Sequence, residues 1–166
     1  MLIRRAIESD FELIWKIFKV VIEPGDTYVF DSNTEREDVF SYWFGVGITA
    51  YVAESEDGQI IGMYKLIPNQ RDLGSHVANA AFMVAPHCQG QGIGRAMGLH
   101  CLEEALNAGY LALQFNFVVS TNQAAVKLWK KLGFSIVGTL PKAFNHKKLG
   151  YVDVYVMYRF LDDKIG

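Results

Sequence analysis

The sequence predicts a mixed α/β fold, in which strands and amphipathic helices share one core. Apolar residues recur at helical spacing over 11–22, and alternating or wholly apolar runs typical of strands lie on both sides of that segment. A glycine-rich loop at 89–94 separates a further strand pattern from a helix pattern. No repeat or linker interrupts the 166 residues, so we expect one domain over residues 1–166.

The N-terminal half predicts two helices and a meander of strands. In chain order we expect a strand over 2–6, a helix to about 22, a second helix to about 44, and strands over 49–54, 60–67 and 77–85. Ser9-x-x-Glu12 is a capping-box pattern for the first helix. Asn33 or Thr34 would cap the second. The turn around Gly58 indicates a hairpin.

The C-terminal half predicts two more helices between strands. We expect a helix over about 95–108, a strand over 111–118, a helix from Asn122 to about 132, and strands over 135–138 and 151–160. The segment 142–150 is expected to be an exposed loop. Asn122 precedes the last helical run, where an asparagine is a favoured N-cap.

The glycine loop Gln89-Gly90-Gln91-Gly92-Ile93-Gly94 predicts an anion site. A loop between strand and helix directs free backbone N–H groups at an anion, and glycines allow close approach. The P-loop pattern fails because Arg95 follows Gly94 where lysine is required, and the dinucleotide pattern is one residue short. The loop therefore predicts a different phosphate-bearing cofactor, and the alternative is a tight strand-to-helix turn.

Two motifs resemble those of the GNAT superfamily of acetyl-CoA-dependent N-acyltransferases. Gln89, Gly92 and Gly94 match Gln/Arg-x-x-Gly-x-Gly/Ala, and 122–134 is similar to the family's Asn-initiated helix that ends in Gly-Phe. The resemblance implies a central, mostly antiparallel mixed sheet of about seven strands, flanked by about four helices and splayed between the fourth and fifth strands. It also implies acetyl-CoA as cofactor and a homodimer.

The resemblance implies a set of cofactor-binding residues. They are Met83, Val84, Gln89, Gly90, Gln91, Gly92, Ile93, Gly94, Arg95, Asn122 and Trp129. Backbone N–H groups of 91–95 would hold the pyrophosphate, and the strand end at 83–84 would pair with the pantetheine arm. Asn122 would hydrogen-bond the arm, or serve only as an N-cap. Trp129 would line the thiol pocket, or be a core aromatic.

The usual acid and base of the superfamily are missing from this chain. Many members resemble one another in having a glutamate on the fourth strand and a tyrosine in the second-motif helix. The strand segment 79–84 has no acid, and Trp129 holds the tyrosine position. An indole N–H donates a hydrogen bond but does not usefully release its proton. The acid and base must therefore come from elsewhere, or the site depends on positioning.

Three further residues are candidates for substrate contacts. The run 115–118, followed by Thr121-Asn122 and with Trp129 in the helix, resembles the branch that includes proline-analogue (azetidine-2-carboxylate) acetyltransferases. In that branch Asn116 matches the substrate-holding residue, which makes it our catalytic and substrate-binding candidate; the alternative is a structural amide. Tyr28 is the candidate lid residue, or a packed loop aromatic. His146 is a candidate base with a pKa near neutrality, or an exposed loop residue.

The composition excludes several classes of binding partner. The net charge is −2 with a pI of about 6.1 and no basic block, so we expect no nucleic acid. No apolar run approaches the ~20 residues that span a bilayer, so we expect no membrane partner, and without a basic segment followed by an apolar run near residue 1 we expect no secretory signal. Cys88 and Cys101 lack metal-ligand spacing, so we expect no metal, and they suggest reduced thiols in the cytoplasm.

The sequence and the resemblance together predict an enzyme that moves acetyl from acetyl-CoA to the amine of a small molecule, an amino acid or its analogue. Direct attack is expected, because no Cys or Ser has a triad-like setting. A protein or peptide N-acetyltransferase is one alternative. A non-catalytic acyl-CoA-binding sensor is the other.

Overall fold

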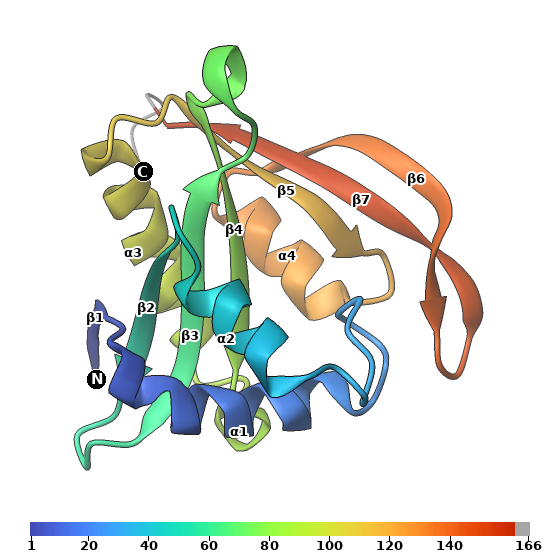
Figure 1. The fold of residues 1–166 in the computed structure, drawn as a ribbon. Helices are drawn as coiled ribbons and strands as arrows, with labels where there is room; N and C mark the ends of the chain where they lie inside the picture. Colours follow the sequence, from blue (N-terminus) through green and yellow to red (C-terminus); the bar gives the residue numbers. More distant parts are fainter. Residues whose placement is uncertain (162–166) are drawn as a thin grey trace.

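The computed structural model describes residues 1–161, in which the strands form one seven-stranded sheet (Figure 1). The strands are β1 (Leu2–Arg5), β2 (Thr49–Glu54), β3 (Ile60–Pro68), β4 (Val77–Val84), β5 (Ala112–Val119), β6 (Ser135–His146) and β7 (Gly150–Phe160). The helices are α1 (Phe11–Ile22), α2 (Arg36–Phe44), α3 (Ile93–Asn107) and α4 (Gln123–Lys131), with short 3-10 helices η1 (Glu8–Asp10), η2 (Asp72–Gly74) and η3 (Pro86–Cys88).

The sheet order is β1-β2-β3-β4-β5-β7-β6. Every pair of neighbours is antiparallel except β4 and β5, which run parallel. This arrangement confirms the predicted mixed sheet, mostly antiparallel and flanked by four helices.

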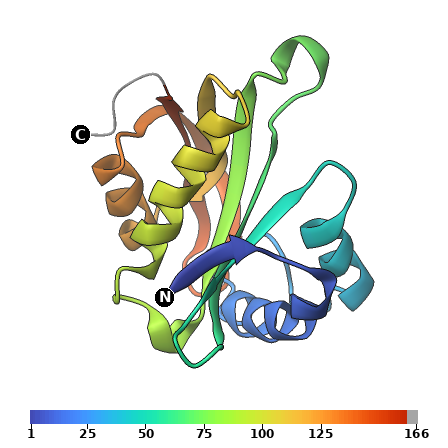
Figure 2. The ribbon, with the colours of Figure 1, turned by 90° about the vertical axis from the view of Figure 1, so that its left-hand side faces the viewer.

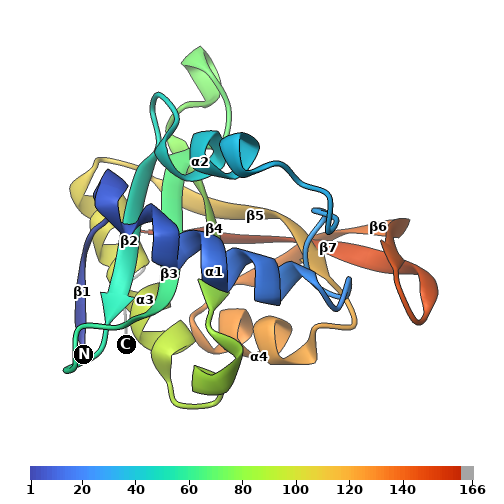
Figure 3. The ribbon, with the colours of Figure 1, turned by 60° about the horizontal axis from the view of Figure 1, so that its bottom comes forward.

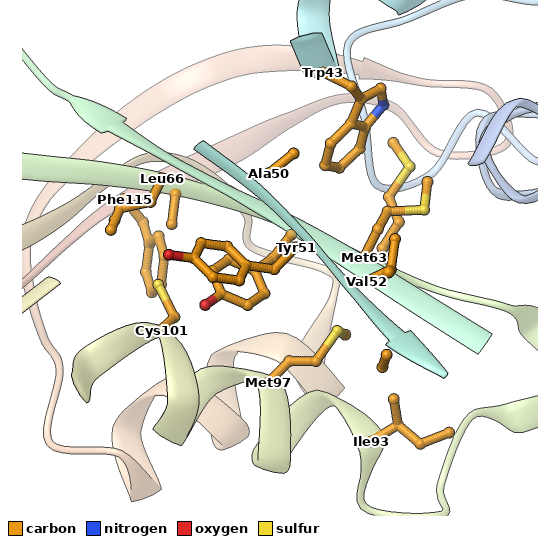
Figure 4. Close-up of a cluster of buried hydrophobic side chains, with 14 of the residues drawn as sticks. Trp43, Ala50, Tyr51, Val52, Met63, Leu66, Ile93, Met97, Cys101 and Phe115 are labelled. Atoms are coloured by element: carbon orange, nitrogen blue, oxygen red, sulfur yellow. The ribbon is translucent and has the colours of Figure 1, made fainter. Parts of the chain in front are cut away.

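Helices cover both faces of the sheet. α1 and α2 lie on one face, and α3 and α4 lie on the other (Figures 2 and 3). Ile14 and Phe18 of α1, four residues apart and fully buried, form the apolar stripe that faces the sheet. Figure 4 shows Trp43 of α2 on one side of the strands and Met97 of α3 on the other. The core is therefore two layers divided by the sheet.

The sheet opens between β4 and β5. These two strands pair only from Val77–Ala112 to Asn79–Gln114, and beyond this point β5 diverges from β4 (Figure 1). Trp129 of α4 packs beneath the opening, with ring centroids 4.9 Å from Phe82 of β4 and 4.5 Å from Phe115 of β5. The predicted splay is thus present, and an aromatic side chain packs between the two strands from the α4 side.

The predicted starts of the first two helices are wrong in detail. Asp10, not Ser9, organises the first start: its carboxylate accepts the Ile7 N–H at 2.9 Å and two Arg4 N–H groups at 2.9 Å each. A carboxylate that also pairs with Arg4 holds this corner more strongly than a serine hydroxyl would. Before α2, the Thr34 hydroxyl donates to the Asp31 carbonyl at 2.8 Å, so it serves the preceding turn and the helix begins later.

The largest error concerns the last hairpin. The segment expected to be an exposed loop, 142–150, is largely strand, because β6 continues to His146 and pairs with β7 on both sides of an irregular stretch. Irregular pairing between Leu140 and Phe144 hides this continuity in the sequence: Lys142 adopts a φ of 52°, and its N–H donates to the Asp153 carboxylate at 2.9 Å. The hairpin projects beyond the rest of the sheet (Figure 3).

Within residues 1–161, no helix combines the length and the apolarity that crossing a bilayer requires.

Candidate active site

The glycine loop turns sharply into α3 through two glycines in left-handed backbone. Gly90 has a φ of 78° and Gly92 a φ of 81°. A Cβ atom at either position would meet nothing within 4 Å, so the conformation, rather than crowding, requires glycine. The Gln91 side chain donates to the His87 carbonyl at 3.2 Å and fastens the loop to η3. The loop is exposed and open to a ligand.

The start of α3 presents backbone donors beside this loop. The Ala96 N–H makes a bond to the Gly92 carbonyl at 3.0 Å. The N–H groups of residues 93–95 precede it and, as in the first turn of any helix, have no carbonyl four residues back. Ile93 is buried and anchors the turn, whereas Arg95 is exposed. Donors, helix dipole and a nearby guanidinium together favour an anion here.

Two glycines of α3 allow α4 to pack close to the loop. A Cβ at Gly94 would lie 3.3 Å from Leu128 Cδ2. A Cβ at Gly98 would lie 2.6 Å from Leu132 Cδ1 and 3.2 Å from Trp129 Cζ3. The sequence prediction did not include Gly98, although its place four residues after Gly94, on the same helix face, was a usable sign.

Asn122 and Trp129 lie where α4 meets the opening in the sheet. The Asn122 Oδ1 accepts the Ala125 N–H at 3.2 Å, so the side chain is an N-cap. Its Nδ2 remains as a donor for a second partner. Trp129 is 7% exposed and packs against Phe82, Phe115 and Phe134, as a core aromatic would.

Successive residues of β4 direct their backbone N–H and carbonyl groups alternately toward β3 and toward the opening. The Ala85 N–H bonds to β3 at 2.9 Å, and every second residue of an antiparallel strand repeats this pairing. Met83, opposite Met63, therefore directs its N–H and carbonyl toward β3. Phe82 and Val84 direct theirs toward the side where β5 has diverged. Of the two expected backbone contacts, Val84 is placed for one and Met83 is not.

Asn116 belongs to a row of side-chain amides on the α1–α2 side of the opening. Its Oδ1 accepts from Gln114 Nε2 at 2.8 Å, and its Nδ2 donates to Asn69 Oδ1 at 2.7 Å. Asn79 donates to the Gln114 carbonyl at 2.9 Å, at the last paired position of β4 and β5. Asn116 is exposed, so the row borders the open end of the splay.

Tyr28 reaches the same region from the loop after α1. Burial raises the pKa of its phenol well above the ordinary value, the neighbouring Tyr42 adds to this rise, and a hydrogen bond with the Phe82 backbone partly offsets it. Because Phe82 directs its backbone into the opening, the Tyr28 oxygen lies at the splayed edge of β4. A phenol in this setting stays protonated at neutral pH and acts as a hydrogen-bond donor.

His146 is buried rather than in an exposed loop. Its Nδ1 accepts two backbone N–H groups, from Lys148 at 3.1 Å and Leu149 at 3.2 Å. The proton of the neutral ring therefore sits on Nε2, and the basic lone pair is engaged. The same turn contacts the loop that leads to Tyr28, because the Lys147 N–H donates to the Gly25 carbonyl at 3.0 Å.

Lys65 was missed by the sequence prediction. It is 5% exposed on β3, and its Nζ donates to the Tyr42 carbonyl at 2.9 Å and lies 3.2 Å from the Tyr42 ring centroid. Burial lowers the pKa of this ammonium to about 8. A lysine in the middle of the apolar run 60–68 was the available sign, since isolated charges are rarely buried without a reason. No carboxylate lies within 4 Å of its Nζ among residues 1–161.

Within the described chain, 1–161, no three His, Cys, Asp or Glu side chains gather in a group that can hold a metal ion. Among residues 1–161, the polar groups that we place near the opening are amides, phenols, backbone N–H groups and the Lys65 ammonium. This set suits hydrogen bonding and charge neutralisation of an organic ligand.

Known proteins share both the sequence pattern and the fold. The N-acetyltransferase aca1 of Schizosaccharomyces pombe is 30% identical over 156 residues, covering 84% of this chain and 75% of the relative. The L-amino acid N-acetyltransferase AaaT of Escherichia coli is 31% identical over 103 residues, covering 62% of this chain and 63% of AaaT. A GCN5-related N-acetyltransferase from Kribbella flavida superposes with a TM-score of 0.91 at 40% identity, covering 96% of each chain.

The family model described as the acetyltransferase (GNAT) family matches residues 11–134. This range includes α1, α2, the glycine loop, the opening between β4 and β5, and α4. The chain therefore belongs to the GNAT family of acetyltransferases and is an N-acetyltransferase.

Proposed function

We propose that this enzyme transfers acetyl from acetyl-CoA to the amine of a small molecule, an amino acid or an amino-acid analogue. The observation that carries the proposal is the junction of two features: the unpaired donors at the start of α3 and the unpaired edge of β4. The first fits a diphosphate and the second fits an extended amide-bearing arm, which are the two recognisable parts of coenzyme A.

The residues present fit this cofactor. The open space at Gly90 and Gly92 admits a diphosphate to the N–H groups of 93–95, with Arg95 as a nearby cation. Phe82 and Val84 offer backbone N–H and carbonyl groups to the arm. Asn122 offers its Nδ2. Bound acetyl-CoA supplies an activated acetyl thioester, and the chain holds that thioester at the opening of the sheet.

The residues within 1–161 that we place on the acceptor side are hydrogen-bonding groups, and none of them is a carboxylate. Deprotonating a lysine-like amine at pH 7 costs about 4.6 kcal/mol, which desolvation of the amine in the site can reduce. Asn116 would orient the amine through its carbonyl oxygen, after exchange of its present partner Gln114. Tyr28, protonated, would donate a hydrogen bond at the edge of β4. Positioning then supplies much of the rate, as effective molarities allow.

The acceptor class is supported by two observations. AaaT, which is 31% identical to this chain over 103 residues, is named for L-amino acid acceptors. The resemblance of the Asn116 region to proline-analogue acetyltransferases suggests the same class. Proline and azetidine-2-carboxylate therefore belong in a first substrate panel, beside primary amino acids.

The proposal is tested by release of free thiol from acetyl-CoA with purified protein. Amino acids, their analogues, simple amines and short peptides are compared at equal concentration. Turnover with amino acids well above peptides supports the proposal. Turnover only with peptides indicates a protein or peptide N-acetyltransferase, and acetyl-CoA binding without turnover of any acceptor indicates a sensor.

Asn116→Ala separates the two roles of that amide. If Asn116 holds the acceptor, turnover falls while the acetyl-CoA dissociation constant and the melting temperature stay near those of the wild type. If the amide is only structural, the melting temperature falls and turnover of the remaining folded protein is preserved.

A further inference from the structure

Lys65 is a buried cation whose counter-charge is missing from the described chain. Its side chain leaves the middle of β3 on the α1–α2 side of the sheet and is 5% exposed. An ammonium has three donors, and the structure gives Nζ one hydrogen bond, to the Tyr42 carbonyl, together with the Tyr42 ring face. Neither contact neutralises the charge. A buried ammonium in this state is costly unless an anion completes it.

The ammonium lies beside the proposed acceptor site. Lys65 is paired with Ala81 of β4, which is next to Phe82 at the opened edge. Tyr42, in contact with Lys65 Nζ, is also a neighbour of Tyr28, and the Tyr28 oxygen lies beside the Phe82 backbone. Lys65 and Tyr42 are therefore in contact, and both lie in the neighbourhood of Tyr28 and the open edge of β4.

An alternative role for Lys65 is structural, as a cap for the C-terminal end of α2. The Tyr42 carbonyl lies in the last turn of α2, where carbonyl groups lack helical partners and a cation is favourable. Such a cap explains one hydrogen bond. It does not explain why the cation is a buried lysine, because exposed lysines cap helices without the desolvation cost.

We infer that Lys65 is the counter-charge for a carboxylate on the acceptor, so that the enzyme selects amines that carry an acid group. This inference rests on the proposed function. The flexible lysine stem allows Nζ to keep the Tyr42 carbonyl and donate its other protons to carboxylate oxygens. Tyr28, whose oxygen lies near the β4 edge, would contact the same substrate. The acceptor carboxylate then lies toward β3 and its amine toward the opening.

The test compares acceptors that differ only in the carboxylate. For one accepted amino acid, kcat/KM is measured beside its primary amide and its decarboxylated amine, with wild type and Lys65→Met. Wild type should favour the acid by about 10- to 100-fold, the range of a hydrogen bond to a charged group. Lys65→Met should lose that preference, mainly through the KM of the acid, while its kcat/KM for the decarboxylated amine changes far less.

Matched variants isolate the charge. Lys131→Met makes the same chemical change at an exposed site on α4 and should leave the preference intact. Lys65→Arg keeps the charge and should keep most of the preference. A structural cap predicts a different pattern: Lys65→Met would lower kcat/KM for all three acceptors by the same factor, which would overturn the inference.

A measurement on the wild type alone covers the case in which Lys65→Met does not fold. The N-acetylated acid and the N-acetylated amide are compared as competitive inhibitors, and the acid should bind at least about 10-fold tighter. Equal inhibition would overturn the carboxylate inference while acetyl transfer itself stands. Absence of any turnover with acids, amides and amines would instead reject the proposed function, so the two failures are distinguishable.

Discussion

Asn116 Nδ2 donates a hydrogen bond to Asn69 Oδ1 across 2.7 Å, and this contact ties β5 to the segment that follows β3. Gln114 completes the row by donating to the Asn116 oxygen at 2.8 Å. An amide with a donor on one side and an acceptor on the other has a fixed orientation. Asn69 therefore fixes the orientation of the Asn116 amide, which we propose contacts the acceptor.

Asn69→Ala should lower the turnover of the acceptor and leave the affinity for acetyl-CoA nearly unchanged. Without its Asn69 partner, the Asn116 amide can rotate, so we expect kcat/KM for the acceptor to fall by about 5- to 10-fold, the worth of one neutral hydrogen bond. The acetyl-CoA dissociation constant, measured by calorimetry, should change less than about twofold. Asn107→Ala, an exposed change at the end of α3, is the control. An equal loss in cofactor binding would contradict this positioning role.

Gly98→Ala should destabilise the contact between α3 and α4. The new Cβ would lie 2.6 Å from Leu132 Cδ1 and 3.2 Å from Trp129 Cζ3, and both side chains are buried in close packing. We expect a loss of about 1–3 kcal/mol in the free energy of unfolding, measured with urea. Gly138→Ala is the matched control, because its Cβ would meet Val156 Cβ at an ordinary 3.9 Å. Equal free energies of unfolding for the two variants would show that α4 can shift away from the new Cβ without loss of stability.

The strands and helices near the glycine loop were predictable because local chemistry determines them. The run of glycines before α3 and the Asn122 cap before α4 lie within one turn of the elements they organise. The core role of Trp129 was also foreseen as an alternative. The full length of the β6–β7 hairpin was not predictable, because Asp153 of β7 accepts a hydrogen bond from the backbone of Lys142 on the facing strand. Sequence periodicity carries no information about such a partner.

The acceptor side was less predictable than the cofactor side. Lys65 was hidden in a strand pattern, because its contacts to Tyr42 come from a helix about twenty residues earlier in the chain. The partners of Asn116 and the location of the Tyr28 oxygen likewise depend on which segments the fold brings together. Most of the proposed cofactor-binding residues lie within 83–95, whereas the proposed acceptor residues come from at least three separate segments.

Lys65 should make stability depend on pH in the alkaline range. Its pKa is lowered to about 8 in the folded protein, below the ordinary 10.5. Between these values the unfolded chain holds a proton that the folded chain has released, so the free energy of unfolding rises with pH. Relative to Lys65→Met, the wild type should gain about 2 kcal/mol from pH 7 to pH 10. Urea unfolding at several pH values measures this gain.

The variant comparison removes the contributions of the tyrosines and of Cys101, which titrate in both proteins. Lys131→Met, at an exposed position, should give a curve parallel to the wild type. If the wild type and Lys65→Met also run parallel from pH 7 to pH 10, the Lys65 ammonium is not destabilised by burial.

Calorimetric titration of acetyl-CoA into the wild type, Gly92→Ala and Gly58→Ala tests the central claim most directly. Gly92 and Gly58 have φ values of 81° and 79°, so both variants carry similar backbone strain, but only Gly92 adjoins the proposed diphosphate site. The wild type and Gly58→Ala should bind one equivalent with a dissociation constant of about 1–100 µM, and Gly92→Ala should bind at least about 10-fold more weakly. No binding heat from the wild type at two temperatures, or equal affinity of the two variants, would contradict a cofactor held by the start of α3.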